Sequence, residues 1–180
     1  MKTICAAWLA SLTVFALPAA AERGSAQAQD APETASSLID ASDPAAIADL
    51  MRRSGFAAEI QSQPNGAVQI QSSLGSTGFW LYFQACEPDF TACEIITLSS
   101  GFDFETPQVR DLLGNWNETH YSKAYLDPAG DPFIEFSINM LHGVSEENFI
   151  NTLSWFTTEL TSFIYRIGWN SGQDGKATPI

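Results

Sequence analysis

The 180-residue sequence is poor in basic side chains, with eight Lys and Arg against 21 Asp and Glu and a formal net charge of −13. Nucleic-acid-binding proteins neutralise phosphates with clustered Lys and Arg, so this charge excludes nucleic acid as a partner. Charged residues make up only 16% of the chain, while apolar residues make up 45%. That balance excludes an extended disordered protein and indicates one globular domain.

The sequence also lacks an apolar run long enough to span a bilayer. Residues 4–17 are almost wholly apolar, but a transmembrane helix needs about 20 such residues. Lys2 precedes this run and the small residues 19–21 follow it, which is the layout of a secretory signal. We therefore expect residues 1–21 to be a signal peptide, cleaved there or at a later small-residue site. The mature protein would be periplasmic or secreted, without stable membrane insertion; an uncleaved membrane anchor is the alternative.

Cysteine is scarce, and only Cys86 and Cys93 lie outside the predicted signal peptide. An even pair in an exported protein favours a disulfide bond. Residues 79–83 and 94–98 are rich in β-forming side chains, and the turn at residues 87–89 would bring the two cysteines together at the end of a hairpin. A metal half-site or a redox pair is the alternative. The sequence offers neither a second Cys/His pair nor a Cys-x-x-Cys spacing.

Composition divides the rest of the chain into three parts. Residues 22–37 are rich in small and polar side chains without an apolar period, which predicts a flexible leader. Residues 171–180 predict a disordered tail. The folded domain is expected over residues 38–170, without internal repeats.

Within the folded domain, apolar periodicity and turn signals predict the element order α-β-β-β-β-α-β-β-α. Asp43-Pro44 is a helix start, and Asn65-Gly66 between alternating segments is a hairpin turn. The last helix, capped by Ser145, carries apolar residues at three- and four-residue steps. The expected elements are a helix between Pro44 and Gly55, a hairpin over 58–70, strands over 79–83 and 94–98, a helix from Thr106-Pro107 to about Asn117, a hairpin over 122–141 and a helix over 145–167. Antiparallel hairpins with helices packed on them define an α+β fold.

Several short motifs together resemble the YbjN-like family. These motifs are Leu112 to Asn117, Lys123 to Asp127, Asp131, and Gly143 to Phe149. Members of that family are described as bacterial sensory transduction regulators. The resemblance covers roughly residues 43–166 and implies a fold similar to that of type III secretion chaperones, which commonly form dimers. It also implies a regulatory or protein-binding role and supplies no catalytic residues. The predicted signal and cysteine pair set this chain apart, because they place it in the envelope and not in the cytosol.

The family motif residues are interpreted as structural. Trp116 is expected to hold its helix against the sheet, while Asn115 and Asn117 bond backbone groups near the helix end. A polar and aromatic binding spot is the alternative at this motif. Asp127 belongs to a hairpin turn, since its surroundings lack the ligand spacing of a calcium loop, and Gly143 precedes the final helix.

No motif in the sequence points to catalysis. The two histidines, His120 and His142, are not spaced as metal ligands, and no Ser-His-Asp pattern or Gly-x-Ser-x-Gly elbow accompanies them. We interpret both as loop or surface residues. The sequence therefore predicts a non-enzymatic protein without a cofactor or a metal.

Aromatic residues outside the expected core are the best candidates for a binding surface. If Phe79 and Leu81 face the core, Trp80 and Tyr82 face the other side of the sheet. Trp155 and Phe156 raise the same question on the final helix. The preferred hypothesis is a protein-binding module of the bacterial envelope. These surfaces would bind another protein or a second copy of the chain in a homodimer. The alternative is a small-molecule sensor or carrier with a pocket lined by Trp80, Tyr82, Trp155 and Phe156.

Overall fold

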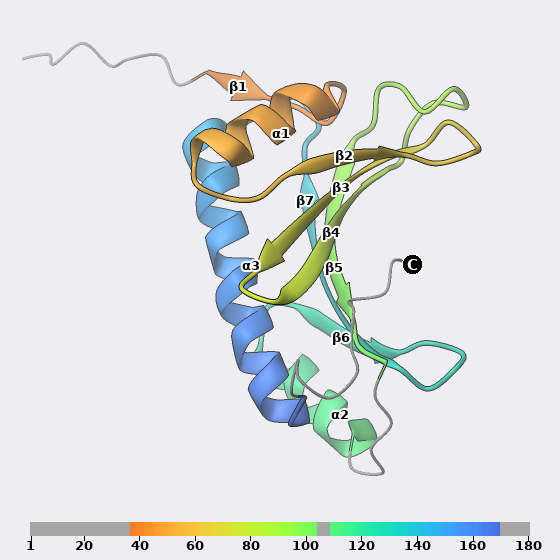
Figure 1. Ribbon diagram of the computed structural model, residues 1–180, viewed down its shortest axis with the longest axis vertical. Helices are drawn as coiled ribbons and strands as arrows, with labels where there is room; N and C mark the ends of the chain where they lie inside the picture. The colour runs from red at the N-terminus through yellow and green to blue at the C-terminus, as the bar shows by residue number, and fades with distance from the viewer. Residues whose placement is uncertain (1–36, 104–108, 170–180) are drawn as a thin grey trace, which may run out of the picture. The chain divides into compact units, whose positions relative to one another are not determined.

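A six-stranded antiparallel sheet forms the centre of the fold (Figure 1), in the order β2-β3-β4-β5-β7-β6. The structure, a computed structural model, describes residues 37–103 and 109–169. The strands of this sheet are β2 (Glu59–Ser62), β3 (Val68–Leu74), β4 (Thr77–Gln84), β5 (Ile95–Gly101), β6 (Lys123–Leu126) and β7 (Pro132–Asn139). The helices of the described residues are α1 (Pro44–Arg53), α2 (Val109–Thr119) and α3 (Glu146–Ile167). The α+β class and the antiparallel sheet predicted from the sequence are confirmed.

A second, two-stranded sheet was not predicted. It pairs β1 (Leu38–Ile39) with β8 (Val144–Ser145) in antiparallel register. The two strands are too short to leave a periodic pattern in the sequence, and they lie far apart along the chain. Together they fix the segment before α1 beside the start of α3.

The helix ends follow the capping signals of the sequence. The Asp43 carboxylate accepts hydrogen bonds from the backbone N–H groups of Ala45 and Ala46, each at 3.0 Å. At the start of α3 the Ser145 hydroxyl accepts the N–H of Asn148 at 3.1 Å. Gly168 ends α3 in the left-handed region, with φ of 72°. The predicted start of the second helix at Thr106-Pro107 lies outside the described residues.

The core lies between α3 and one face of the sheet. Every third or fourth residue of α3 points toward the strands, and the aromatic ring of Phe156 meets that of Phe79 with 5.4 Å between centroids. Figure 1 shows α3 running along this face, with α1 and α2 near its two ends. The predicted apolar stripe of α3 is buried as a whole: Phe149, Leu153, Phe156, Leu160, Phe163 and Ile167. Burial of each such side chain contributes about 1.5–3 kcal/mol, so this stripe holds the helix on the sheet.

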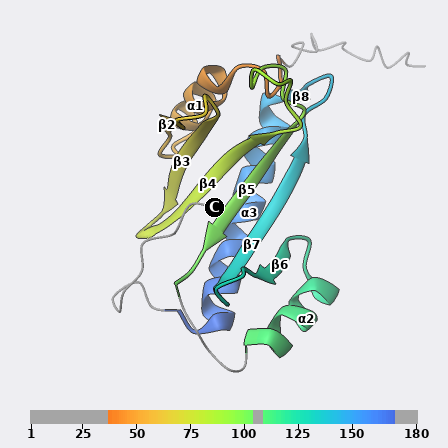
Figure 2. The ribbon, with the colours of Figure 1, turned by 90° about the vertical axis from the view of Figure 1, so that its right-hand side faces the viewer.

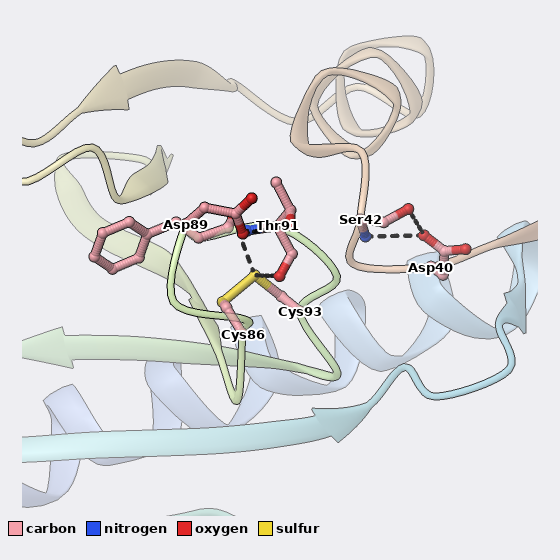
Figure 3. The surroundings of a disulfide bond; sticks show 7 residues. Asp40, Ser42, Cys86, Asp89, Thr91 and Cys93 are labelled. Carbon is pink, nitrogen blue, oxygen red and sulfur yellow. Dashed lines mark hydrogen bonds between the residues drawn. A yellow bond between two sulfur atoms is a disulfide. The ribbon is translucent and has the colours of Figure 1, made fainter.

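The predicted disulfide bond between Cys86 and Cys93 is present in the structure. It closes the connection between β4 and β5, just beyond the last cross-strand pair of Gln84 and Ile95 (Figure 3). The enclosed loop also contains an Asp89 carboxylate that accepts hydrogen bonds from the Thr91 backbone and hydroxyl. The loop is therefore held both by the covalent bridge and by a local turn.

The sheet face opposite α3 carries a hydrogen bond between Tyr125 and Glu135. The Tyr125 hydroxyl donates to the Glu135 carboxylate at 2.7 Å, and its ring stacks on Phe133 with 5.6 Å between centroids. The pKa of the Tyr125 hydroxyl is raised well above its ordinary value, mainly because the side chain is partly buried. The hydrogen bond to Glu135 and the negative charge of that carboxylate raise it further.

This pair yields a prediction about alkaline pH. The difference between the tyrosinate absorbance titrations of the wild type and of Tyr125→Phe reports Tyr125 alone, and its midpoint is expected well above pH 10. Because the folded state favours the protonated hydroxyl, its contribution to stability is present below pH 10 and is lost as the pH rises further. A midpoint near 10 in the folded protein would contradict the bond to Glu135.

None of the helices within residues 37–103 and 109–169 is long and apolar enough to cross a membrane.

Candidate functional site

A groove with a volume of about 320 Å³ opens at one side of α3. It is lined by Tyr121 from the connection between α2 and β6, Phe136 from β7, and three residues of α3. The α3 residues are Trp155, Thr158 and Glu159. Ligand-binding pockets span roughly 300–1,000 Å³, so this aromatic groove is at the small end of that range.

Two large aromatic side chains stand exposed at the aromatic groove. Tyr121 is 82% exposed and Trp155 is 55% exposed, and their rings stack with 5.9 Å between centroids. Trp and Tyr are the residue types most often found where a few side chains supply most of the binding energy of a protein interface. The stacked pair limits the motion of both rings, so a partner would lose little side-chain entropy in covering them.

The position of Tyr121 is set by a chain of hydrogen bonds at the next residue, Ser122. The Trp116 indole N–H donates to the Ser122 hydroxyl at 3.1 Å, and that hydroxyl donates to the Glu159 carboxylate at 2.6 Å. The backbone N–H of Ser122 donates to the same carboxylate at 3.3 Å. Buried Trp116 on α2 thus links the start of β6 to α3, and this link holds Tyr121 beside Trp155.

The neighbouring asparagines make further ties between elements. Asn117 forms two hydrogen bonds with the backbone of Ala124, accepting its N–H at 2.7 Å and donating to its carbonyl at 2.9 Å. The Asn115 side-chain oxygen accepts a hydrogen bond from Arg166 of α3 at 3.3 Å. The Asn115-Trp116-Asn117 motif therefore joins α2 to β6 and to α3.

This motif lies within a segment that the sequence model of the YbjN family matches. That model, described as "Putative bacterial sensory transduction regulator", covers residues 43–169, from the N-cap of α1 to the residue after the C-cap of α3. The chain belongs to the YbjN family. No curated protein matches it. That description fits a regulatory role for the YbjN domain.

The structure of the YbjN domain separates the four aromatic residues proposed from sequence. Trp155 lines the aromatic groove, but the adjacent Phe156 is fully buried in the core. Trp80 and Tyr82 lie on β4 with their side chains on the face opposite α3, as the alternation with Phe79 predicts. The four residues therefore do not line one common pocket between the sheet and the last helix.

Trp80 and Tyr82 nevertheless form a pair of their own. Their rings stack with 6.5 Å between centroids, and Trp80 is only 5% exposed. The Trp80 indole N–H and the hydroxyl of Ser99, its neighbour on β5, have no hydrogen-bond partner. Among residues 37–103 and 109–169 no helix covers this face, since the buried residues of α1, α2 and α3 belong to the core on the other side. Trp80 is too buried to act as an exposed contact.

The remaining residues singled out from sequence occupy turns and loops of the YbjN domain. The Asp127 carboxylate accepts the backbone N–H groups of Ala129, Gly130 and Asp131, each at 2.9 Å, which closes the turn between β6 and β7. Gly143 has φ of 82°, and a Cβ there would lie 3.1 Å from the Leu38 Cβ. In the part of the chain that the structure describes, no group of three His, Cys, Asp or Glu side chains could hold a metal ion.

The two histidines also take their places in the YbjN domain. The His120 ring stacks on Trp116 with 3.6 Å between centroids, and His142 adopts a positive φ of 65° in the loop between β7 and β8. His120 thus covers one face of the tryptophan that holds the network at Ser122.

Sequence reasoning missed Tyr121, Phe136 and Glu159. One signal was available: the arms of the second predicted hairpin were unequal, since its first strand was expected from residue 122 and its second as far as residue 141. The longer second strand must extend beyond the point where the first strand begins. Tyr121 is the aromatic residue just before that first strand. The contact of Glu159 with Ser122 depends on the packing of α3 and leaves no local signal.

Proposed function

We propose that this YbjN protein is an exported, non-enzymatic regulatory module that binds another protein in the bacterial cell envelope. The observation that supports binding is the exposed Tyr121–Trp155 pair at the edge of an apolar groove. Exposed aromatic residues next to a hollow are typical of protein interfaces, where each can contribute 2 kcal/mol or more. The regulator family is consistent with such a role.

Export is supported by two features. The predicted signal peptide over residues 1–21 directs the chain out of the cytosol, and a disulfide between Cys86 and Cys93 persists in an oxidising compartment. In this proposal the leader over residues 22–37 precedes the domain and the tail over residues 171–180 follows it.

A non-enzymatic role is supported by the use of polar side chains in the domain. Asp127 closes a turn and Glu135 accepts the Tyr125 hydroxyl, and neither of these two residues lines the aromatic groove. Each of these carboxylates serves as a hydrogen-bond acceptor within the fold. An acid–base catalyst would instead be presented to a substrate within a pocket.

Photo-crosslinking in living cells tests the proposed binding. A benzoylphenylalanine residue at Thr158 would sit at the aromatic groove, while the matched control at Tyr165 lies on the same helix, is 87% exposed and does not line the groove. We expect an envelope protein to be crosslinked from position 158 and not from position 165. Trp155→Ala should reduce that adduct about tenfold or more, because truncation of a central interface residue costs about 2 kcal/mol or more.

Other outcomes would contradict the proposed function. Equal adducts from positions 158 and 165 would indicate random collision. A lack of adducts at position 158, with the protein folded and exported, would count against protein binding. An adduct with a second copy of the chain would make the aromatic groove a homodimer interface.

A further inference from the structure

Half of strand β7 has no neighbouring strand on the side where β6 lies. β6 pairs with residues 132–135 of β7, from Leu126 opposite Pro132 to Lys123 opposite Glu135. β5 covers the other side of β7 as far as Asn139. Figure 2 shows β6 beside the lower part of β7 and the upper part at the edge of the sheet. In the described segments of the chain, the edge of β7 over residues 136–139, here called the open edge, is unpaired.

The backbone groups of the open edge can be assigned from the ladder. Asp127 N–H donates to the Asp131 carbonyl on the β6 side, and Met140 N–H donates to the Glu94 carbonyl on the β5 side. In an antiparallel ladder, alternate residues direct both backbone groups to the same neighbour. The N–H and C=O groups of Ser137 and Asn139 therefore point away from β5, in the plane of the sheet, at the open edge. Such a row of donors and acceptors is a template for another strand.

The chain just before β6 is bound to α3 and does not continue the pairing along β7. A continuation of β6 beyond Lys123 would place Ser122 opposite Phe136. The pairing stops at Lys123, and both the N–H and the hydroxyl of Ser122 donate to the Glu159 carboxylate of α3. Tyr121 then stacks on Trp155 and does not pair with β7.

The aromatic groove lies where the side chains of an added strand would point. Phe136 faces the α3 side of the sheet and lines the groove together with Trp155. Side chains alternate along a strand, so residues of an added strand opposite Phe136 and Ile138 would face the same side. The open edge and the groove thus offer backbone pairing and an apolar recess at one place.

We propose that the open edge binds its partner by strand addition, taking an extended peptide segment that runs antiparallel to β7 and places an apolar side chain in the aromatic groove. This inference rests on the proposed function and specifies its partner. The open edge spans four residues and is bounded by Lys123 of β6 and by the turn after Asn139, which suits a peptide better than the long edge of a folded sheet. Backbone pairing would give affinity and the groove would give specificity.

Charge indicates the composition of the segment. Glu135 lies next to the open edge and Glu159 lines the groove, on a protein with a formal net charge of −13. A second copy of this acidic chain would be repelled, whereas a segment with Lys or Arg flanking its apolar residue would be attracted. The segment is therefore expected to be basic as well as apolar.

A library of random linear dodecapeptides displayed on phage, panned against the exported protein, tests this inference. Enriched peptides are expected to alternate apolar residues and to carry Lys or Arg. Ser137→Pro removes an N–H that points out of the sheet and leaves the β5 ladder intact, and it should weaken binding of a synthetic enriched peptide at least tenfold. Ser137→Ala keeps that N–H and should bind as the wild type does.

The peptide supplies a second comparison. N-methylation at alternate residues blocks one edge of an added strand, so one of the two alternately methylated forms should lose binding at least tenfold and the other should retain it. Should Ser137→Pro fail to fold, hydrogen exchange on the wild type decides, since bound peptide must protect the amides of Ser137 and Asn139. Unchanged exchange at those amides would overturn strand addition.

Different results would overturn strand addition and protein binding. Enriched peptides that bind wild type and Ser137→Pro equally would overturn strand addition, and an envelope adduct at position 158 would leave protein binding in place. A dimer that Ser137→Pro converts to a monomer in light scattering would show that a second copy occupies the edge, which also overturns the peptide proposal. Loss of the envelope adduct itself would overturn the proposed function.

Discussion

Replacing Trp116 with alanine is expected to lower the free energy of unfolding by about 3–5 kcal/mol, the usual cost of removing a large aromatic side chain from a core. Trp116 is fully buried on α2, and its ring meets that of Phe163 on α3 with 5.1 Å between centroids. It also donates the indole hydrogen bond to Ser122. The substitution would therefore leave a cavity and free the hydroxyl that fixes the start of β6.

Urea unfolding followed by circular dichroism would measure this loss. Trp116→Phe is the matched control, because it keeps an aromatic ring against Phe163 but removes the indole N–H. It should cost less than alanine, with about 1 kcal/mol of its loss coming from the hydrogen bond. Loss of less than 1 kcal/mol in the alanine variant would contradict the role of Trp116 as the link between α2 and α3.

The elements of this fold could be predicted where their signals are local. The Asp43 cap, the Asn65-Gly66 turn and the apolar stripe of α3 each depend on residues within one or two turns of the chain, and each appears in the structure. The pairing of β1 with β8 depends on segments about a hundred residues apart, joined by two residues each. No local pattern could indicate it.

The candidate site could be predicted only in part. Phe156 belongs to the stripe that includes Leu153 and Leu160 at three- and four-residue steps, whereas Trp155 is turned by about 100° from it on a helix of 3.6 residues per turn. Helical phase alone therefore separates the exposed residue from the buried one. The β4 alternation likewise gives the face of Trp80, but its burial there is a tertiary property that alternation does not determine.

The aromatic groove depends on contacts between distant elements. Tyr121 meets Trp155 because Ser122 is bound to Glu159, and this bond forms only when α2, β6 and α3 are packed together. The unequal length of β6 and β7 was visible in the sequence, but the side chains that fill the space beside the longer strand were not.

Removing the disulfide by Cys86→Ser with Cys93→Ser is expected to lower the free energy of unfolding by about 2–3 kcal/mol. In the chain-entropy model a bridge that closes a short loop restricts the unfolded chain by about this amount. The enclosed segment contains two non-glycine residues with positive φ, Phe90 at 62° and Ala92 at 48°. A non-glycine residue with positive φ destabilises the folded state by about 1–2 kcal/mol. Without the bridge the loop can move these residues to a more favourable backbone conformation, which offsets part of the lost stability. The decrease in the free energy of unfolding should therefore fall at the lower end of the range.

Urea unfolding of the exported protein with and without dithiothreitol measures the bridge independently of the substitutions. Reduced wild type should match the double serine variant, and unreduced protein should show no free thiol after denaturation, since the remaining cysteine, Cys5, lies in the predicted signal peptide. The bridge lies beyond the ends of β4 and β5, whereas the open edge of β7 is formed by residues 136–139. Peptide binding at the open edge should therefore survive reduction while stability falls. Two free thiols in unreduced protein would contradict both the bridge and the argument for export that depends on it.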